Sequence, residues 1–319
     1  MRVLIVQPFP QLHKFLQFRA TTILLDALRQ HGIEWTQINP REVSVDLTKY
    51  DIALFHNFGY FFSQALERNY VDLYTKLYYI FKDRSFPFLP STDSFVAYHS
   101  YCLDRWHQNN IPCPGFQVLG RSRNTVELEY PLVLRRNRKM LRGADMFLVN
   151  SHKEFHQTRK NHRRPLDLLT VYHNTQHPDG YYRKRRCIVI GDDVHPRQAQ
   201  LSPDWKVKLN RVPPEILGKQ IEEDKRFMEE GETEENKQIL VNASNAVGLE
   251  AGAIDYVILP NGKMLLFETN RCFGLAGASD TKASEEFRLV TGRTKKEVLK
   301  QFDALGESYV KLIKSKVPK

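Results

Sequence analysis

The segment that decides the fold is GAIDYVILPNGKMLLFETN, residues 252–270. The Pro-Asn-Gly turn at 260–262 separates two apolar runs, and Asn-Gly between alternating apolar residues is a strong hairpin signal. On such a hairpin Glu268 and Asn270 are two residues apart, so their side chains face the same side of the sheet. Cross-strand pairing can bring Asp255 beside them. The segment therefore predicts three oxygen-bearing side chains gathered in one place.

Two carboxylates and an amide oxygen form the kind of ligand set that Mg²⁺ prefers, usually shared with water and nucleotide phosphates. Without a cation, the two carboxylates would repel each other on an otherwise aliphatic hairpin. The alternative is that Asp255 and Glu268 each pair with one of the many arginines of the chain. The hairpin alone leaves both interpretations open.

Composition places the chain among ordinary globular proteins. It has 319 residues, of which 41% are hydrophobic and 26% charged, and this length allows two or three domains. The 47 Lys and Arg against 37 Asp and Glu leave a net charge of +10, which favours anionic partners: nucleotide phosphates, an acidic substrate or nucleic acid. No apolar run is as long as a membrane span, and the N-terminus lacks a signal-peptide pattern. We therefore expect a cytoplasmic protein with no membrane partner.

Several catalytic signatures are missing from the sequence. The four cysteines show no CxxC spacing, which predicts buried or incidental thiols in a reducing compartment. The first strand is not followed by GxGxxG, and no GxSxG is present. His152 and His156 are four residues apart, but no HExxH surrounds them. These observations argue against dinucleotide-binding, serine-hydrolase and zinc-protease classes.

Hydrophobic periodicity gives a coarse order of elements. Strands are expected at residues 2–6, 34–38, 51–55, 131–134, 146–149, 168–172 and 186–190, followed by the hairpin. Helices are expected at residues 16–28, 64–81, 91–109, 151–162 and 234–249, and along the C-terminal segment. Strand–helix alternation at the N-terminus predicts a parallel sheet with helical crossovers. Ser91 or Thr92 is the expected N-cap of the third helix.

With Asp255, Glu268 and Asn270 in this order and spacing, the chain resembles the ATP-grasp family of ATP-dependent carboxylate ligases. In that family a strand Asp followed by Glu-x-Asn holds the magnesium ions that bridge the phosphates of ATP. The resemblance is nearest to the glutathione synthetase-like and ribosomal-protein glutamate ligase-like branch. It implies an α/β and α+β chain with the ATP-grasp fold. The implied segments are an N-terminal Rossmann-like pre-ATP-grasp domain at 1–88, a linker unit at 89–118, a small lid at 119–200 and a C-terminal carboxylate-bearing mixed-sheet domain at 201–319.

The resemblance also implies cationic phosphate contacts. Arg135 ends an apolar strand where the family has a lysine, and Arg105 replaces the lysine of an Asp-Lys pair. Both changes keep a positive charge but alter the geometry of the contact. Lys206 and Lys208, which would share one face of a strand, correspond to phosphate-binding polar residues. Gly143 is the one glycine in a basic loop that corresponds to the family's glycine-rich phosphate loop.

The remaining implied site residues serve the base and the reacting groups. Val171 and Tyr172 correspond to the hinge that gives backbone hydrogen bonds to adenine. Arg186 matches the family's arginine for the terminal phosphate or acyl phosphate, and its neighbour Arg185 would point to the opposite face. The family often has another arginine shortly before the strand Asp, which is absent here, so Arg271 or Arg186 would take that role.

The activity implied by the resemblance is ATP- and Mg²⁺-dependent ligation of a carboxylate to an amine or thiol. The carboxylate attacks the terminal phosphate of ATP, and the nucleophile then displaces phosphate from the acyl phosphate. The implied cofactors are ATP and two Mg²⁺ ions, with Mn²⁺ as an alternative; the substrates include amino acids or peptides, and a homodimer is compatible. Two other hypotheses are an ATP-grasp relic that binds nucleotide without ligating, supported by the Lys-to-Arg changes, and a basic nucleic-acid-binding protein.

Overall fold

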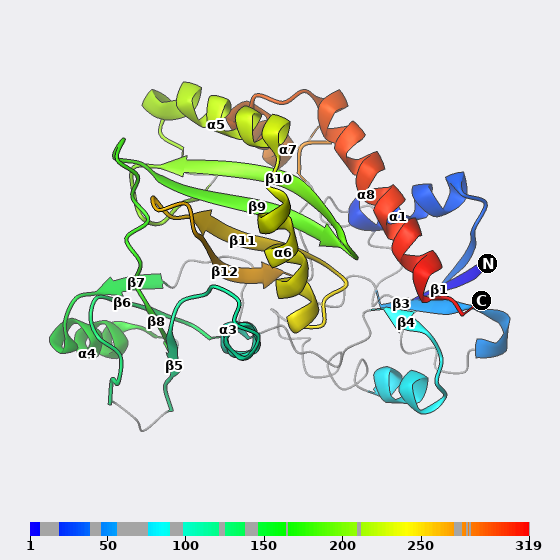
Figure 1. The fold of residues 1–319 in the computed structure, drawn as a ribbon, viewed down its shortest axis with the longest axis horizontal. Helices are drawn as coiled ribbons and strands as arrows, with labels where there is room; N and C mark the ends of the chain where they lie inside the picture. The colour runs from blue at the N-terminus through cyan, green and yellow to red at the C-terminus, as the bar shows by residue number, and fades with distance from the viewer. Residues whose placement is uncertain are drawn as a thin grey trace.

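The computed structural model describes residues 1–6, 19–38, 46–55, 76–89, 98–120, 125–137, 146–163, 165–208, 212–270, 276–278, 280 and 282–318. The described strands form three four-stranded sheets. Figure 1 shows these sheets distributed along the long axis of the molecule, with the largest in the middle. This arrangement agrees with the α/β and α+β fold class predicted from the sequence.

The N-terminal sheet is parallel, with strand order β2-β1-β3-β4. Its elements are β1 (Arg2–Val6), α1 (Arg19–Gln30), β2 (Glu34–Ile38), the 3-10 helix η3 (Leu47–Lys49), β3 (Ile52–Phe55) and β4 (Phe88–Leu89). The three strands predicted here are confirmed. Of the helix predicted at 64–81, the structure describes only the part from residue 76, and residues 76–83 are helical.

The second sheet is antiparallel, with order β5-β8-β6-β7, and it lies at the left in Figure 1. It contains β5 (Phe116–Val118), β6 (Leu132–Arg135), β7 (Met146–Val149) and β8 (Leu168–Val171), with α4 (His152–Asn161) packed against it. Ser151 begins α4 by accepting a hydrogen bond from the backbone of Glu154. Phe155 fixes this helix by burying its ring among the apolar side chains of the sheet.

The central sheet has order β10-β9-β11-β12, and all its described pairings are antiparallel, where a mixed sheet was expected. Its strands are β9 (Tyr182–Ile190), β10 (Asp193–Ser202), β11 (Ala251–Ile258) and β12 (Met264–Asn270). The predicted hairpin is confirmed as β11 and β12, and Gly262 adopts a φ of +81° in its turn. Because β9 pairs with β11 and β10 pairs with β9, the sheet boundary falls before residue 182. The predicted lid segment extends to residue 200, and the division into domains stays a prediction.

Helices cover the central sheet on both faces. They are α3 (His99–Gln108), η6 (Pro214–Ile216), α5 (Leu217–Glu230), α6 (Glu234–Ala246), α7 (Lys282–Thr291) and α8 (Lys295–Lys316). Alternate residues of β9 enter two cores, as the strand period of two requires. Cys187 and Val189 pack with α3 and α6, whereas Ile188 and Ile190 pack with α1 and α8. Figure 1 shows α6 lying across one face of this sheet.

Helix α8 also joins the N-terminal sheet to the central sheet. It packs on α1, and Gly306 permits the close approach because a Cβ there would lie 2.9 Å from the Cβ of Ala27. The apolar side chains of both helices belong to one core with β1, β3 and β9. The N-terminal and central sheets therefore share a continuous core rather than a solvated linker.

One local prediction is wrong. Residues 203–208 are irregular and do not form the strand expected around Lys206 and Lys208. Ser202 ends β10 and its hydroxyl accepts a hydrogen bond from the backbone of Asp204, so a turn begins there. The expected alternation of the two lysines on one strand face therefore does not apply.

Candidate active site

Cross-strand register places a row of polar residues over the whole central sheet. Gln198 of β10 is opposite Arg186 of β9, Arg186 is opposite Asp255 of β11, and Asp255 is opposite Glu268 of β12. Directly paired residues project from the same face of a sheet. Asn270 lies in the neighbouring row, opposite Ala253. The structure thus brings together the three oxygen-bearing residues predicted from the sequence.

Asp255 is held by two cations from β9. The residue is 3% exposed, and both its carboxylate oxygens accept hydrogen bonds from the guanidinium of Arg186, Oδ2 at 2.8 Å from Nη2. Lys184 Nζ lies 3.4 Å from the same Oδ2. Burial raises the pKa of Asp255, but the charges of Arg186 and Lys184 outweigh it, and the net pKa is lowered. Asp255 is therefore a buried, ionised and paired carboxylate.

Glu268 faces a different group of partners, drawn from three segments. Arg135 Nη2 at the end of β6 lies 3.5 Å from Glu268 Oε2, and His99 Nδ1 at the start of α3 lies 3.6 Å from the same oxygen. Asn270 Nδ2 donates to Glu268 Oε1 at 3.1 Å. Burial lowers the pKa of Arg135, and the charge of Glu268 partly offsets this effect. Glu268 thus links the hairpin to the second sheet and to α3.

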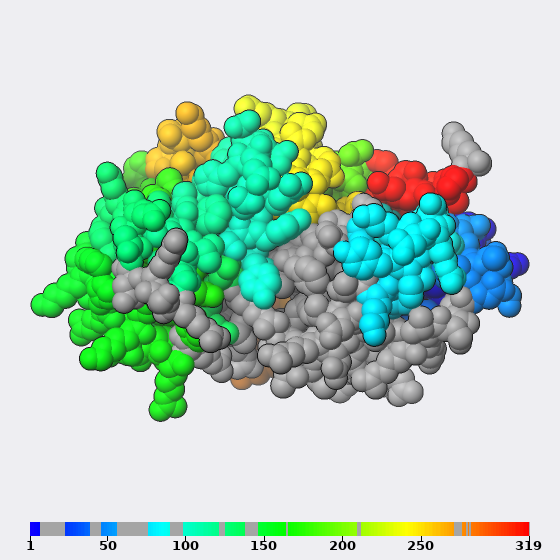
Figure 2. Space-filling view, turned by 90° about the horizontal axis from the view of Figure 1, so that it is seen from below, coloured from blue at the N-terminus to red at the C-terminus, as the bar shows by residue number. Residues whose placement is uncertain are grey.

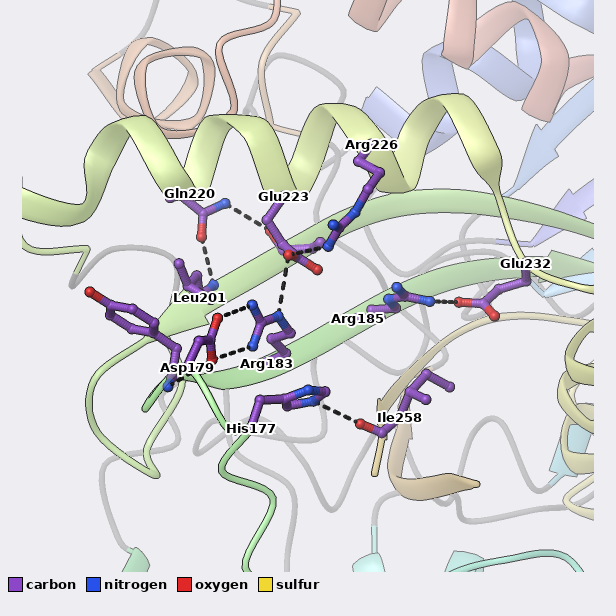
Figure 3. A network of polar contacts seen from close by, with 12 residues as sticks. His177, Asp179, Arg183, Arg185, Leu201, Gln220, Glu223, Arg226, Glu232 and Ile258 are labelled. Atoms are coloured by element: carbon purple, nitrogen blue, oxygen red, sulfur yellow. Dashed lines mark hydrogen bonds and ion pairs between the residues drawn. The ribbon is translucent and has the colours of Figure 1, made fainter. Parts of the chain in front are cut away.

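The opposite face of β9 has a separate, structural use for its arginines. Figure 3 shows Arg183 between Asp179 and Glu223, and Arg185 donating to Glu232. Arg185 also lies over the Phe227 ring at 4.9 Å. Among the four basic residues at 183–186, Lys184 and Arg186 therefore face Asp255. The other two, Arg183 and Arg185, face α5. The expectation that Arg185 and Arg186 point to opposite faces is confirmed.

One of the two predicted hinge residues, Tyr172, lies near one predicted lysine, Lys206. Tyr172 and Lys206 both contact Trp205, with ring centroids 6.0 Å apart for Tyr172 and Nζ 5.1 Å from the ring centroid for Lys206. Burial and a hydrogen bond with Tyr182 raise the pKa of Tyr172 to about 12. The backbone N–H of Val171 donates to Gly115 and that of Tyr172 to Pro131, so these two donors are already engaged. Their role toward a base stays a prediction.

The other predicted contacts divide into two groups. Arg105 Nε donates to the Ala246 carbonyl at the end of α6, and its Nη1 donates to Gln108. The first bond joins α3 to α6 and the second lies within α3, and the structure does not bring Arg105 to the carboxylates. Lys208 lies at the end of the irregular segment at 203–208. Gly143 and Arg271 lie outside the described residues, as do Ser91 and Thr92, the expected caps.

Sequence reasoning missed two members of the site. Lys184 could have been found, because it is two residues before Arg186 and shares its strand face. His99 carried no such signal: it lies on α3, far from the hairpin in sequence, and no local pattern marks it. Only the packing of α3 against β12, together with the backbone hydrogen bond from His99 to Asn137, brings its ring to Glu268.

The donor set fits a hard divalent cation. Two ionisable carboxylates are cross-strand neighbours, and Asn270 adds an amide oxygen beside them. The surrounding lysine and two arginines carry the charges that phosphate oxygens would attract. Within the described ranges, no three His, Cys, Asp or Glu side chains gather as metal ligands, so such a site needs the Asn270 oxygen and outside oxygens such as phosphate or water.

None of the described helices is long and apolar enough to cross a membrane.

Comparison with known proteins places the fold. No model of a known protein family matches the chain, and no curated protein matches it. Among solved structures, D-alanine–D-alanine ligase from Bacillus anthracis, complexed with ATP, matches with a TM-score of 0.51 and 13% identity, covering 99% of this chain and 98% of that one. N5-carboxyaminoimidazole ribonucleotide synthetase from Thermotoga maritima matches with a TM-score of 0.53 and 12% identity, covering 92% and 77%. The chain has the ATP-grasp fold.

D-alanine–D-alanine ligase from Coxiella burnetii is a further ATP-grasp match, with a TM-score of 0.50, 12% identity and coverage of 99% and 98%. At sequence identities this low, the structural matches establish the fold alone, and the activity has to be argued from the residues of the site. The nearer resemblance to the glutathione synthetase-like and glutamate ligase-like branch stays a prediction.

Proposed function

We propose that this ATP-grasp chain is an ATP- and Mg²⁺-dependent ligase that joins a carboxylate to an amine through an acyl phosphate. The observation that carries the proposal is the cross-strand pair Asp255 and Glu268, with Asn270 beside it and cations from β6 and β9 converging on it. Replacing a buried ion pair with apolar residues is often neutral or stabilising, so stability alone is a weak reason for these charges to gather here. The fold it shares with two kinds of ATP-grasp ligase supports the same reaction type.

The residues suggest a division of work. Asp255, Glu268 and Asn270 would hold Mg²⁺, which when bound neutralises phosphate charge. Arg186 and Lys184 lie on the Asp255 side of the row and would bind the terminal phosphate as the substrate carboxylate attacks it. Attack forms the acyl phosphate and releases ADP; the amine then forms the C–N bond, phosphate leaves, and the amine's surplus proton is lost to solvent. The protein contributes positioning and charge, and no covalent step of its own.

The proposal is tested by phosphate release from ATP with a panel of amino acids and dipeptides as acids and amines. Hydroxylamine serves as a general trap that converts an acyl phosphate to a hydroxamate. We expect release that needs an acid and Mg²⁺ and hydroxamate formation with the same acid. If the protein binds ATP but releases no phosphate with any of the acids, the alternative hypothesis is supported: an ATP-grasp relic that binds nucleotide without ligating. Absence of ATP binding would contradict the proposal altogether.

Mg²⁺ and nucleotide should bind cooperatively. In the structure the Asp255 carboxylate is occupied by Arg186 and Lys184, so Mg²⁺ alone would have to displace both cations. When ATP binds, its phosphates offer those cations other partners, and the carboxylates become available. We expect a nonhydrolysable ATP analogue to raise Mg²⁺ affinity at least about tenfold, within the usual range of coupling between sites. Calorimetric titration of Mg²⁺ with and without the analogue measures this ratio, and a ratio near one would contradict the account.

A further inference from the structure

His99 belongs to the group of side chains around Glu268, and no sequence pattern indicated it. Its side chain is 4% exposed, and it lies at the first turn of α3 between Arg135 of β6 and Glu268 of β12. Arg135 Nη2 is 2.8 Å from His99 Nε2, and His99 Nδ1 is 3.6 Å from Glu268 Oε2. The Nε2 atom of this ring therefore contacts Arg135, which is predicted to bind phosphate. Its Nδ1 atom faces Glu268, which is predicted to bind the metal.

The contact with Arg135 fixes the tautomer of the ring. A guanidinium nitrogen can only donate, so His99 Nε2 must accept through its lone pair. The ring is then neutral, and its proton lies on Nδ1, the nitrogen that faces the Glu268 carboxylate. The opposite tautomer would direct an N–H at the donor of Arg135 and a lone pair at an anion. Both contacts agree on a single arrangement.

The backbone of His99 is tied to the strand that carries Arg135. The His99 N–H donates to the Asn137 carbonyl at 2.8 Å, and the Ser100 N–H donates to Asn137 Oδ1 at 2.9 Å. Asn137 lies two residues after Arg135, and it supplies the N-terminal capping that Tyr98 does not give to α3. The start of α3 and the end of β6 are thus joined twice, once by backbone and cap and once through the imidazole.

These contacts have a functional consequence beyond stability. Arg135 has a long, flexible side chain, and holding its head group costs conformational entropy. By donating a hydrogen bond to a buried, neutral ring, the guanidinium is held in place without competition for its charge, which stays available for an anion. The same ring places Nδ1 3.6 Å from the oxygen of Glu268 that faces Arg135, so the imidazole lies directly beside that carboxylate.

We propose that His99 is a positioning residue that holds Arg135 toward the nucleotide phosphates and orients Glu268 for the metal. This role rests on the proposed function, because it concerns the same nucleotide site. Its chemical requirement is specific: an acceptor at the position of Nε2 and a donor toward Glu268. A glutamine side chain reaches as far as Nε2 and offers both groups, whereas leucine fills the space and offers neither.

The test compares His99→Leu and His99→Gln for ATP affinity at saturating Mg²⁺. We expect the leucine variant to bind ATP about tenfold or more weakly, as for lost partners of metal ligands, and the glutamine variant to retain most of the affinity. His107→Leu is the matched control on the same helix, since His107 is exposed and its ring contacts the Pro114 carbonyl, and it should leave affinity unchanged. Thermal midpoints report whether either variant only loses stability.

The outcomes separate this inference from the proposed function. If the wild type binds ATP and the leucine variant binds it equally well, or if glutamine is as impaired as leucine, the positioning role is overturned. If the wild type does not bind ATP, the proposed function fails and the role fails with it. Ring ¹⁵N shifts of the nucleotide-free protein give an independent readout: we expect protonated Nδ1 and unprotonated Nε2, and the reverse would contradict the geometry. This spectrum tests the proposed arrangement of His99 even if the leucine variant does not fold.

Discussion

Replacing Glu268 with Gln should reduce ATP-dependent phosphate release by at least about 100-fold while the protein stays folded. Loss of an outer partner of a metal ligand typically costs 10–100-fold, and a ligand itself should cost no less. Glutamine keeps the shape of the side chain, and it can still accept a hydrogen bond from Asn270. It removes the negative charge that a divalent cation requires beside Asp255. Phosphate release measured at several Mg²⁺ concentrations, together with the thermal midpoint, checks this expectation.

The matched control for this change is Glu235→Gln. Glu235 is exposed in the first turn of α6, outside the polar row, and its loss should leave phosphate release unchanged. Activity in the Glu268 variant equal to that of the control would show that the hairpin carboxylate does not bind the metal.

Replacing Arg186 with Met should lower the free energy of unfolding by about 3 kcal/mol at neutral pH. Removing one partner of a buried ion pair typically costs about 3–5 kcal/mol because the other charge stays buried and unpaired. Lys184 remains near Asp255, so the loss of unfolding free energy should lie at the lower end of this range. The control is Arg2→Met, which breaks an exposed pair with Glu34 and should cost less than about 1 kcal/mol. Urea unfolding measures both.

The loss in the Arg186 variant should depend on pH. In the wild type the pKa of Asp255 is lowered in the folded state, so its contribution to stability is present above the unfolded pKa of about 4 and is lost as the pH falls through the folded value. Without Arg186, burial would raise the folded pKa above the unfolded one. The variant would then gain stability by binding a proton as the pH falls. The difference between the two proteins should therefore be largest near pH 7 and shrink toward about pH 4, and a difference that is constant or grows on acidification would contradict the assignment.

The sequence predicted the central part of the site because its signals are local. The Asn-Gly turn determines the hairpin, and the period of two then fixes which side chains of β11 and β12 share a face. The same period separates Arg185 from Arg186. The alternative that each carboxylate pairs with an arginine also describes the structure, since Asp255 contacts Arg186 and Glu268 contacts Arg135. The ion pairs are therefore confirmed, and the metal site that would use the same oxygens stays a prediction.

The remaining features depend on tertiary packing that a single sequence does not specify. His99 is a site residue only because Asn137 fixes the start of α3 beside β6. Arg105 contacts α6 because the packing of α3 turns it toward Ala246. The segment at 203–208 has the lysines of a phosphate-binding strand, yet it turns after Ser202 instead of extending. For Arg105 and the two lysines the local pattern is compatible with the predicted role and the fold decides otherwise, whereas for His99 no local pattern predicts a role at all.

The most direct test of the central claim is an electron paramagnetic resonance titration of Mn²⁺ and ATP with the protein. Mn²⁺ replaces Mg²⁺ at oxygen sites and reports its own surroundings. We expect the wild type to convert the signal of free Mn–ATP into that of a protein-bound complex, and the double variant Glu268→Gln, Asn270→Ala to leave the free signal in place. Equal conversion by the folded double variant would show that the hairpin oxygens do not hold the cation.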